Sequence, residues 1–147
     1  MNVKDAIKRV LDEGGIKARK DYFLASCFTT LKGAEEPSEW IVNFYNPKKK
    51  TIVDFYVSSD IKEGGEAPAL KPTKPLEPDN VKVELAEVLK NVSIMKGAIK
   101  TLVFLHKKHV WTINVIGRSM DVASWEFDAR NGELLGKKKT SLILNRK

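Results

Sequence analysis

Two amphipathic patterns along the chain predict helices. The apolar residues of the first follow the three-to-four-residue spacing of one helix face. They are Val3, Ala6, Ile7, Val10 and Leu11. The glycine pair at 14–15 then ends the pattern. A second pattern of the same spacing covers residues 85–92, with Asp79 or Asn80 placed to cap its start. Each half of the chain is therefore expected to begin with a helix.

Six segments alternate apolar and polar residues with the two-residue period of a half-buried strand, and they are rich in β-branched and aromatic residues. These segments are residues 21–31, 39–45, 51–57, 99–105, 109–116 and 121–127. The stretch "WEFDARNGELLGKKK" at 125–139 predicts a hairpin, because Asn131 and Gly132 supply the positive φ angles of a tight turn. A further strand is expected at 140–145, "TSLILN".

The two halves of the sequence can be aligned. On one face of the middle strand, "WIVNF" at 40–44 matches "WTINV" at 111–115, with the tryptophans in register. On the opposite face of the same strands, Asn43 matches Asn114. After a one-residue shift, the apolar positions of 53–57 match those of 123–127, including Trp125. The pattern indicates an internal repeat of helix and three strands.

Residues 60–79 hold four of the six prolines and a glycine pair, which is typical of a linker. We therefore predict a first half at 1–59, a linker at 60–79 and a second half at 80–147. The expected fold class is α+β, with two helix-plus-antiparallel-hairpin halves that form one or two antiparallel sheets covered by helices. An unpaired sheet edge would also allow a homodimer.

The second half resembles the PepSY family. An amphipathic helix is followed by "VWTINVIGRSMDVASWEFDARNGELLG", which contains a strand hairpin with a tryptophan and an alternating strand that ends in the turn "DARNGELL" at 128–135. The resemblance covers residues 82–136. In the first half only the helix and the "EWIVNFY…TIVDFYV" hairpin fit, and "SSDIKEGG" replaces the final turn. The helix-on-sheet shape is also similar to cystatin-like inhibitors. The resemblance implies a non-catalytic binding role, with inhibition as the family's suggested activity.

The composition narrows the class of protein. The longest apolar runs are too short to span a bilayer, and the start of the chain lacks a signal-peptide pattern, so we expect a soluble cytoplasmic protein. Glutamine is absent while 31% of residues are charged, which is typical of heat-adapted proteins. A single cysteine, Cys27, excludes an internal disulfide.

Two lysine clusters are the sharpest candidates for binding a partner. The chain has 26 basic and 19 acidic residues, and its net charge is +7. Each cluster follows a turn residue and precedes a predicted strand, and the clusters are Lys48, Lys49 and Lys50, and Lys137, Lys138 and Lys139. They can contact phosphates, and Tyr45 and Tyr56 have the strand parity needed to stack on bases. Alternatively, lysines protect sheet edges or simply keep the surface solvated.

Other candidate chemistry is weaker. His106 and His109 bracket a two-lysine turn and can offer two metal ligands, but an ordinary exposed loop explains them better. Cys27 is expected to be a buried thiol, because no histidine is placed to activate it. The carboxylates carried by strands are read as the wet face of half-buried strands. These are Asp54, Asp121, Glu126 and Asp128.

We therefore predict a protein that is not an enzyme and uses no cofactor or metal. Its function is expected to be docking of an unidentified protein or peptide on a sheet face or edge. The faces expected to take part carry Ile41, Asn43, Tyr45, Thr112 and Asn114. The alternative is a basic nucleic-acid-binding protein that uses the two lysine clusters. A small hydrolase is a third reading, which lacks a clear nucleophile–base pair.

Overall fold

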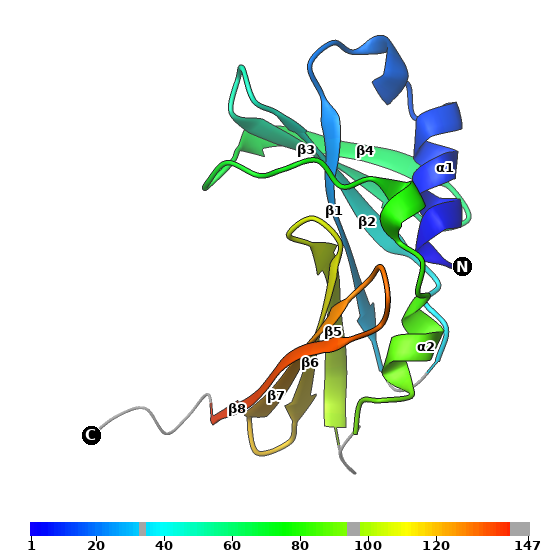
Figure 1. Cartoon of the computed structure of the whole chain (residues 1–147). Coiled ribbons are helices and arrows are strands. Elements are labelled where there is room, and N and C mark those ends of the chain that lie inside the picture. The colour runs from blue at the N-terminus through cyan, green and yellow to red at the C-terminus, as the bar shows by residue number, and fades with distance from the viewer. Residues whose placement is uncertain (33–34, 94–97, 142–147) are drawn as a thin grey trace.

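The fold is one antiparallel sheet of eight strands with two helices on one of its faces (Figure 1). The computed structural model describes residues 1–32, 35–93 and 98–141. The strand order is β4-β3-β2-β1-β5-β6-β7-β8. The strands are β1 (Phe23–Leu31), β2 (Trp40–Asn46), β3 (Thr51–Val57), β4 (Ile61–Pro68), β5 (Ala98–His106), β6 (Val110–Gly117), β7 (Asp121–Asp128) and β8 (Leu134–Ser141).

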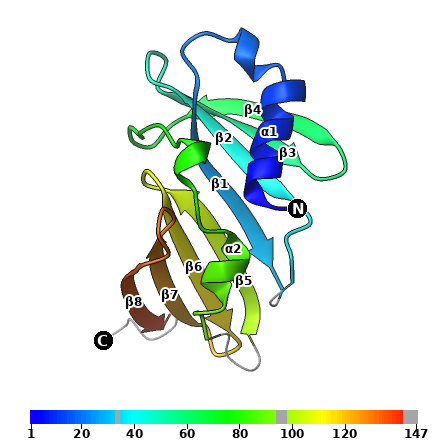
Figure 2. The same ribbon diagram turned by 45° about the vertical axis from the view of Figure 1, so that its right-hand side comes forward.

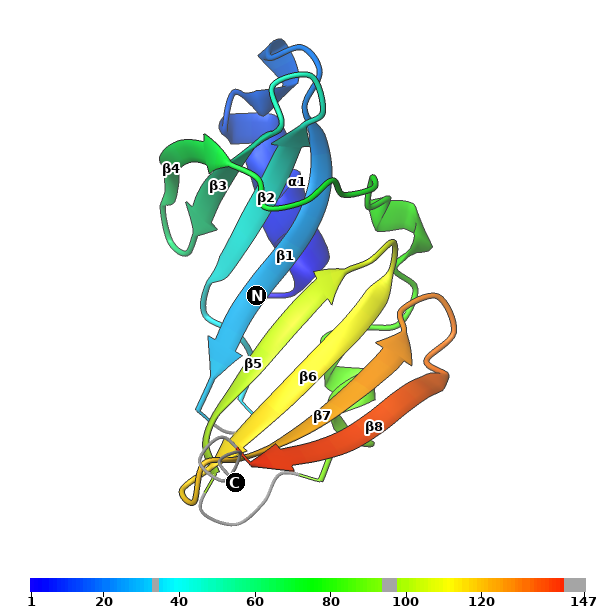
Figure 3. The same cartoon turned by 90° about the vertical axis from the view of Figure 1, so that its left-hand side faces the viewer.

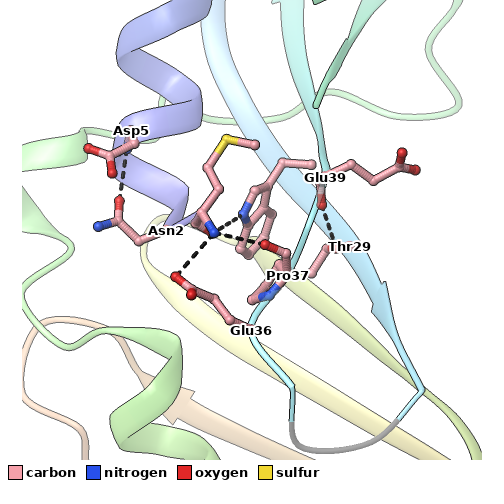
Figure 4. Close-up of polar contacts among 8 residues, drawn as sticks. Asn2, Asp5, Thr29, Glu36, Pro37 and Glu39 are labelled. Carbon is pink, nitrogen blue, oxygen red and sulfur yellow. Dashed lines mark hydrogen bonds and ion pairs between the residues drawn. The ribbon is translucent and has the colours of Figure 1, made fainter. Parts of the chain in front are cut away.

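The helices are α1 (Val3–Glu13) and α2 (Leu85–Leu89), and they lie on the same side of the sheet (Figure 2). Short 3-10 turns occur at η1 (Ile16–Ala18) and η2 (Pro78–Asn80). The side chain of Asn2 caps α1 by accepting a 2.9 Å hydrogen bond from the backbone N–H of Asp5 (Figure 4). No helix in the described part of the chain is long and apolar enough to cross a membrane.

The predicted fold class is wrong. We expected helix-plus-hairpin halves whose helices cover the sheets, whereas the structure is mainly a single sheet with helices of 11 and 5 residues. The sheet is continuous because β1 pairs with β5, from Cys27 opposite Leu105 to Leu31 opposite Thr101. The expected helix at 85–92 stops at Leu89, since the next backbone N–H groups bond three residues back rather than four. Glu84, not Asp79 or Asn80, is its N-cap residue.

The six predicted strands are confirmed, but the segment expected to be a linker contains a strand that was not predicted. Residues 61–68 form β4, an edge strand paired with β3. The chain then crosses past the beginning of β1 (Figures 1 and 3), where the N–H of Leu76 donates to the carbonyl of Leu24 at 2.8 Å. The strand expected at 140–145 lies mostly outside the described residues, and β8 ends at Ser141.

The hydrophobic core lies between the sheet and the helices. The strand parity predicted from the sequence is confirmed, because the aligned apolar residues of β2, β3, β6 and β7 are all buried. They are Trp40, Val42, Phe44, Val53, Phe55, Val57, Trp111, Ile113, Val115, Ala123, Trp125 and Phe127. The rings of Trp40 and Trp111 lie 6.2 Å apart, one from each side of the β1–β5 junction. One continuous core therefore joins the strands of both halves.

Candidate binding surface on the uncovered face of the sheet

One face of the sheet is covered by neither helix. Figure 3 is turned toward this face, and α1 and α2 lie behind the strands in that view. We call it the outer face. Its side chains alternate along each strand with the buried core residues, and many are only partly buried although they are apolar. They include Phe28, Ile41, Ile52, Leu102, Phe104, Ile116 and Val122. A sheet face that neither helix covers is a surface on which a partner can dock.

A single row of residues crosses the outer face from one edge of the sheet to the other. Cross-strand pairing aligns them, and we call them the central row. In strand order from β4 to β8 they are Lys62, Tyr56, Ile41, Phe28, Phe104, Thr112, Glu126 and Gly136. The rings of Phe28 and Phe104 pack with centroids 4.7 Å apart, and Tyr56 is 45% exposed. The half of the row between β3 and β5 is therefore apolar.

The other half of the row enters a shallow polar groove over β6, β7 and β8. The groove has a volume of about 590 Å³, and its walls include Lys107, Asn114, Ser124 and Lys138. Lys107 forms a 2.9 Å ion pair with Glu126. This contact, more than any other, lowers the pKa of the Glu126 carboxyl group, so the groove holds one charged carboxylate beside two ammonium groups.

One hydroxyl group of the groove wall, that of Thr112, lies beside an imidazole, which the sequence did not indicate. The Nε2 atom of His106 lies 2.9 Å from Oγ1 of Thr112, and that hydroxyl donates to Oε2 of Glu126 at 3.3 Å. Burial lowers the pKa of His106, and the charge of Lys107 adds to the effect. Because the hydroxyl proton already has a charged acceptor in Glu126, the imidazole is not its natural base. These hydrogen bonds therefore hold the side chains of the groove in place, and they are not suited to activate a nucleophile.

The asparagines predicted to mark the docking faces do lie on the outer face. Asn43 donates from Nδ2 to Oγ of Ser26 at 2.8 Å, while Asn114 accepts at Oδ1 from Oγ of Ser124 at 2.6 Å. Ile41 and Thr112 belong to the central row. The expectation for Tyr45 is wrong, because only 3% of the residue is exposed and its ring packs edge-on against Phe23. Tyr45 therefore offers no face to a base or a partner.

The two lysine clusters do not form one track. Lys48 pairs with Asp21 at 3.4 Å, and the ammonium of Lys49 sits 5.9 Å from the ring centre of Tyr22. The second cluster lies in β8, five strand positions from β2, which corresponds to roughly 24 Å. Within it, side chains alternate between faces as in any strand. Lys138 reaches the outer face beside Ser124, whereas Lys137 and Lys139 lie on the opposite side.

The two histidines are held apart rather than brought together. Strand β5 ends at His106, and the turn is formed by three residues with positive φ, Lys107, Lys108 and His109. His106 faces the polar groove, but Nε2 of His109 accepts a 3.0 Å hydrogen bond from the backbone N–H of Glu77. The exposed-loop reading is wrong for His109, which is 8% exposed and helps to hold the crossing segment.

Cys27 is fully buried, and burial raises the pKa of its thiol, so the predicted buried-thiol reading is confirmed. The strand-borne carboxylates differ among themselves. Asp54 has a raised pKa because the side chain is partly buried, whereas the side chain of Arg130 lowers the pKa of Asp128 through a 3.0 Å contact. These residues do not form a paired acid–base site with Glu126.

Comparison with known proteins does not assign the chain to a family. No family model, curated protein or solved structure matches it. The resemblance of residues 82–136 to the PepSY family therefore stays a prediction.

A second groove, of about 620 Å³, lies between the start of α1 and α2. Leu85, Leu89 and Trp40 supply apolar wall, and Glu36 lies at the rim. The polar groups at this end are already paired with one another, as Figure 4 shows. The amino group of Met1 contacts Glu36 at 3.1 Å and the carbonyl of Pro37 at 2.8 Å, and Trp40 donates from Nε1 to the carbonyl of Met1. The outer face, by contrast, extends across all eight strands of the described sheet.

Proposed function

We propose that this protein is a non-catalytic binding protein that docks a protein or peptide on its outer face. The observation that supports the proposal most is the apolar half of the central row, which runs unbroken through Tyr56, Ile41, Phe28 and Phe104 on an uncovered face. Aromatic and large aliphatic side chains at the centre of a polar surface are the usual anchors of protein interfaces.

The sheet edges are less suited to binding than the face. A partner strand added to β8 would run beside three lysines and a register shift opposite Glu126 and Phe127. A register shift also interrupts β4, between the positions opposite Val53 and Phe55. Bulges and edge lysines are features by which natural sheets avoid pairing with further strands. Docking on the face therefore fits the structure better than strand addition.

A nucleic-acid partner is less favoured by the same surface. Phosphates would meet the carboxylates of Asp54 and Glu126 on the outer face, and Lys48 is already paired with Asp21. The rings of Phe28 and Phe104 pack on each other, which leaves less of each ring face for a base. The lysines are then best explained as a solvated, edge-protecting surface.

The proposal is tested with a library of random 12-residue peptides displayed on phage, selected on the immobilised protein. Selected peptides are synthesised with a fluorescent label, and their Kd is measured by anisotropy for the wild type and for Phe104→Thr. Threonine, a β-branched residue, is also favoured in strands, but it removes the ring. Leu134→Thr is the matched control, because Leu134 is 51% exposed in β8 and lies opposite the core residue Phe127, on the other face of the sheet from the row.

We expect Phe104→Thr to weaken binding at least tenfold, because removing a central aromatic anchor typically costs about 2 kcal/mol. Leu134→Thr should leave Kd unchanged, and both variants should keep the wild-type circular dichroism spectrum. Labelled DNA and RNA oligonucleotides are titrated in parallel from low to physiological salt. Peptides that bind Phe104→Thr as well as the wild type would contradict the proposal. So would binding confined to oligonucleotides and lost steeply with salt.

A further inference from the structure

The polar groove lies directly beside the apolar half of the central row, so one docked segment can occupy both. The pairing Phe104–Thr112–Glu126 leads from the apolar half into the groove. A second row runs parallel to the first, two residues further along the strands. Its members are Thr30, Leu102, Asn114, Ser124 and Lys138. The end of this second row, over β6 to β8, forms part of the groove wall.

The charges that remain free in the groove are positive. Lys107 is neutralised by Glu126, to which it bonds at 2.9 Å. Lys138, in contrast, forms no ion pair or side-chain hydrogen bond within residues 1–32, 35–93 and 98–141, and it is exposed on the outer face. An incoming group therefore meets one uncompensated ammonium beside an ion pair that is already satisfied.

The groove also offers a free hydrogen-bond donor, the side-chain amide of Asn114. Ser124 donates its hydroxyl proton to Oδ1 of Asn114 at 2.6 Å, which occupies the amide oxygen. The Nδ2 group of Asn114 makes no hydrogen bond to the described part of the protein and is not buried without a partner, so it faces solvent. At the matching position in the other half, Asn43 already uses one of its two Nδ2 hydrogens on Ser26.

An ammonium and an amide donor flanking Ser124 are complementary to a carboxylate. We infer that the groove binds an acidic side chain of the docked segment, held between Asn114 and Lys138, while an apolar side chain of the same segment packs on Phe28 and Phe104. The inference rests on the proposed function and names its partner class, an acidic protein segment. A phosphate group carries a larger negative charge than a carboxylate, so the nearby carboxylate of Glu126 disfavours it more strongly.

The geometry also sets the spacing of the two side chains. Two strand spacings and two residues along a strand separate Phe104 from Ser124, which corresponds to roughly 12 Å. An extended peptide rises about 3.3 Å per residue, so the acidic residue should lie three to four positions from the apolar one.

The test uses the Phe104-dependent peptides from the library selection. Each is synthesised in its acidic form and with the acid replaced by its amide, and both are titrated against the wild type, Lys138→Gln and Lys139→Gln. Lys139 is the matched control, since it is a neighbouring lysine of β8 whose side chain lies on the opposite face. Lys138→Glu provides the charge reversal, and inorganic phosphate and a single-stranded oligonucleotide are used as competitors.

We expect the selected peptides to contain an apolar residue and an acidic residue three to four positions apart. The amide form should bind the wild type about threefold more weakly, as for an exposed ion pair. This difference should vanish in Lys138→Gln, reverse in Lys138→Glu and persist in Lys139→Gln. The inference would be overturned if the acidic and amide peptides bound the wild type equally, or if the ratio of their Kd values were unchanged in Lys138→Gln. Displacement of the bound peptide by phosphate alone, or by the oligonucleotide alone, would also overturn it. A different result would contradict the proposed function itself, namely that Phe104→Thr weakens the binding of none of the selected peptides.

Discussion

Replacing Trp111 by alanine is expected to destabilise the protein strongly, because this side chain joins several parts of the core. Trp111 is fully buried in β6, and its ring lies 6.2 Å from that of Trp40 in β2. Its Nε1 atom donates a 2.9 Å hydrogen bond to the carbonyl of Val83, which ties the segment before α2 to the sheet.

The magnitude follows from two losses. Removing a buried tryptophan side chain costs about 3–5 kcal/mol through lost burial and the cavity left behind. The carbonyl of Val83 also loses its donor, which adds about 1 kcal/mol. The sum, about 4–6 kcal/mol, is a large part of the roughly 5–15 kcal/mol that stabilises a typical domain. It corresponds to a fall in Tm of roughly 10–20 °C for a chain of this size.

The assay is urea denaturation, followed by far-ultraviolet circular dichroism and by tryptophan fluorescence. Trp111→Phe is the control, because it keeps most of the volume and loses mainly the hydrogen bond, at about 1–2 kcal/mol. Since one core joins both halves, the two probes should report a single transition in the wild type. The error of linear extrapolation is about 1 kcal/mol. If the free energy of unfolding of Trp111→Ala differs from the wild-type value by less than this, the proposed role of Trp111 in the core is refuted.

Four other experiments have expected outcomes. Trp125→Ala should lower the free energy of unfolding by about 3–5 kcal/mol in urea denaturation, since Trp125 is 4% exposed in the core. Asp54→Asn should raise Tm at neutral pH. Burial raises the folded-state pKa of Asp54, so the charged carboxylate destabilises the folded protein and a neutral amide does not. The gain in Tm should shrink as the pH falls, because acid protonates the wild-type carboxyl group. Asp128→Asn should have the opposite effect in thermal scans. Arg130 lowers the folded-state pKa of Asp128, so its stabilisation is present above about pH 4 and is lost as the pH falls through the folded-state value. Native Cys27 should not react with a thiol reagent until urea unfolds the chain, because it is fully buried and burial raises its pKa.

The strand positions could be predicted because they depend on a local signal. A two-residue period in β2, β3, β6 and β7 determined which side chains face the core, and Trp40 and Trp111 are buried as that period predicts. Strand β4 was missed because its sequence, "IKEGGEAP", has no alternation and only one large apolar residue, Ile61, at its start. Edge strands depend on their neighbour for pairing, and this dependence is not visible in their own sequence.

The pairing of β1 with β5 could not be predicted, because it depends on which edges of two separate segments meet. That pairing creates the central row, so the sequence named Ile41 and Thr112 but not Phe28 or Phe104 between them. A signal for the two phenylalanines did exist, since each alternates with a buried neighbour and so points to the outer face. Tyr45 has the same parity but is buried, which only the tertiary structure reveals.

The most direct test of the docking surface is a map of amide chemical shifts. The tightest selected peptide is titrated into protein labelled with nitrogen-15, and the shifts are assigned along the chain. If the partner docks on the outer face, the largest changes in amide chemical shift are expected at Ile41, Phe28 and Phe104, with little change at Leu85 and Leu89. Changes concentrated at Leu85 and Leu89 would place the partner in the groove between α1 and α2 and would contradict the central claim.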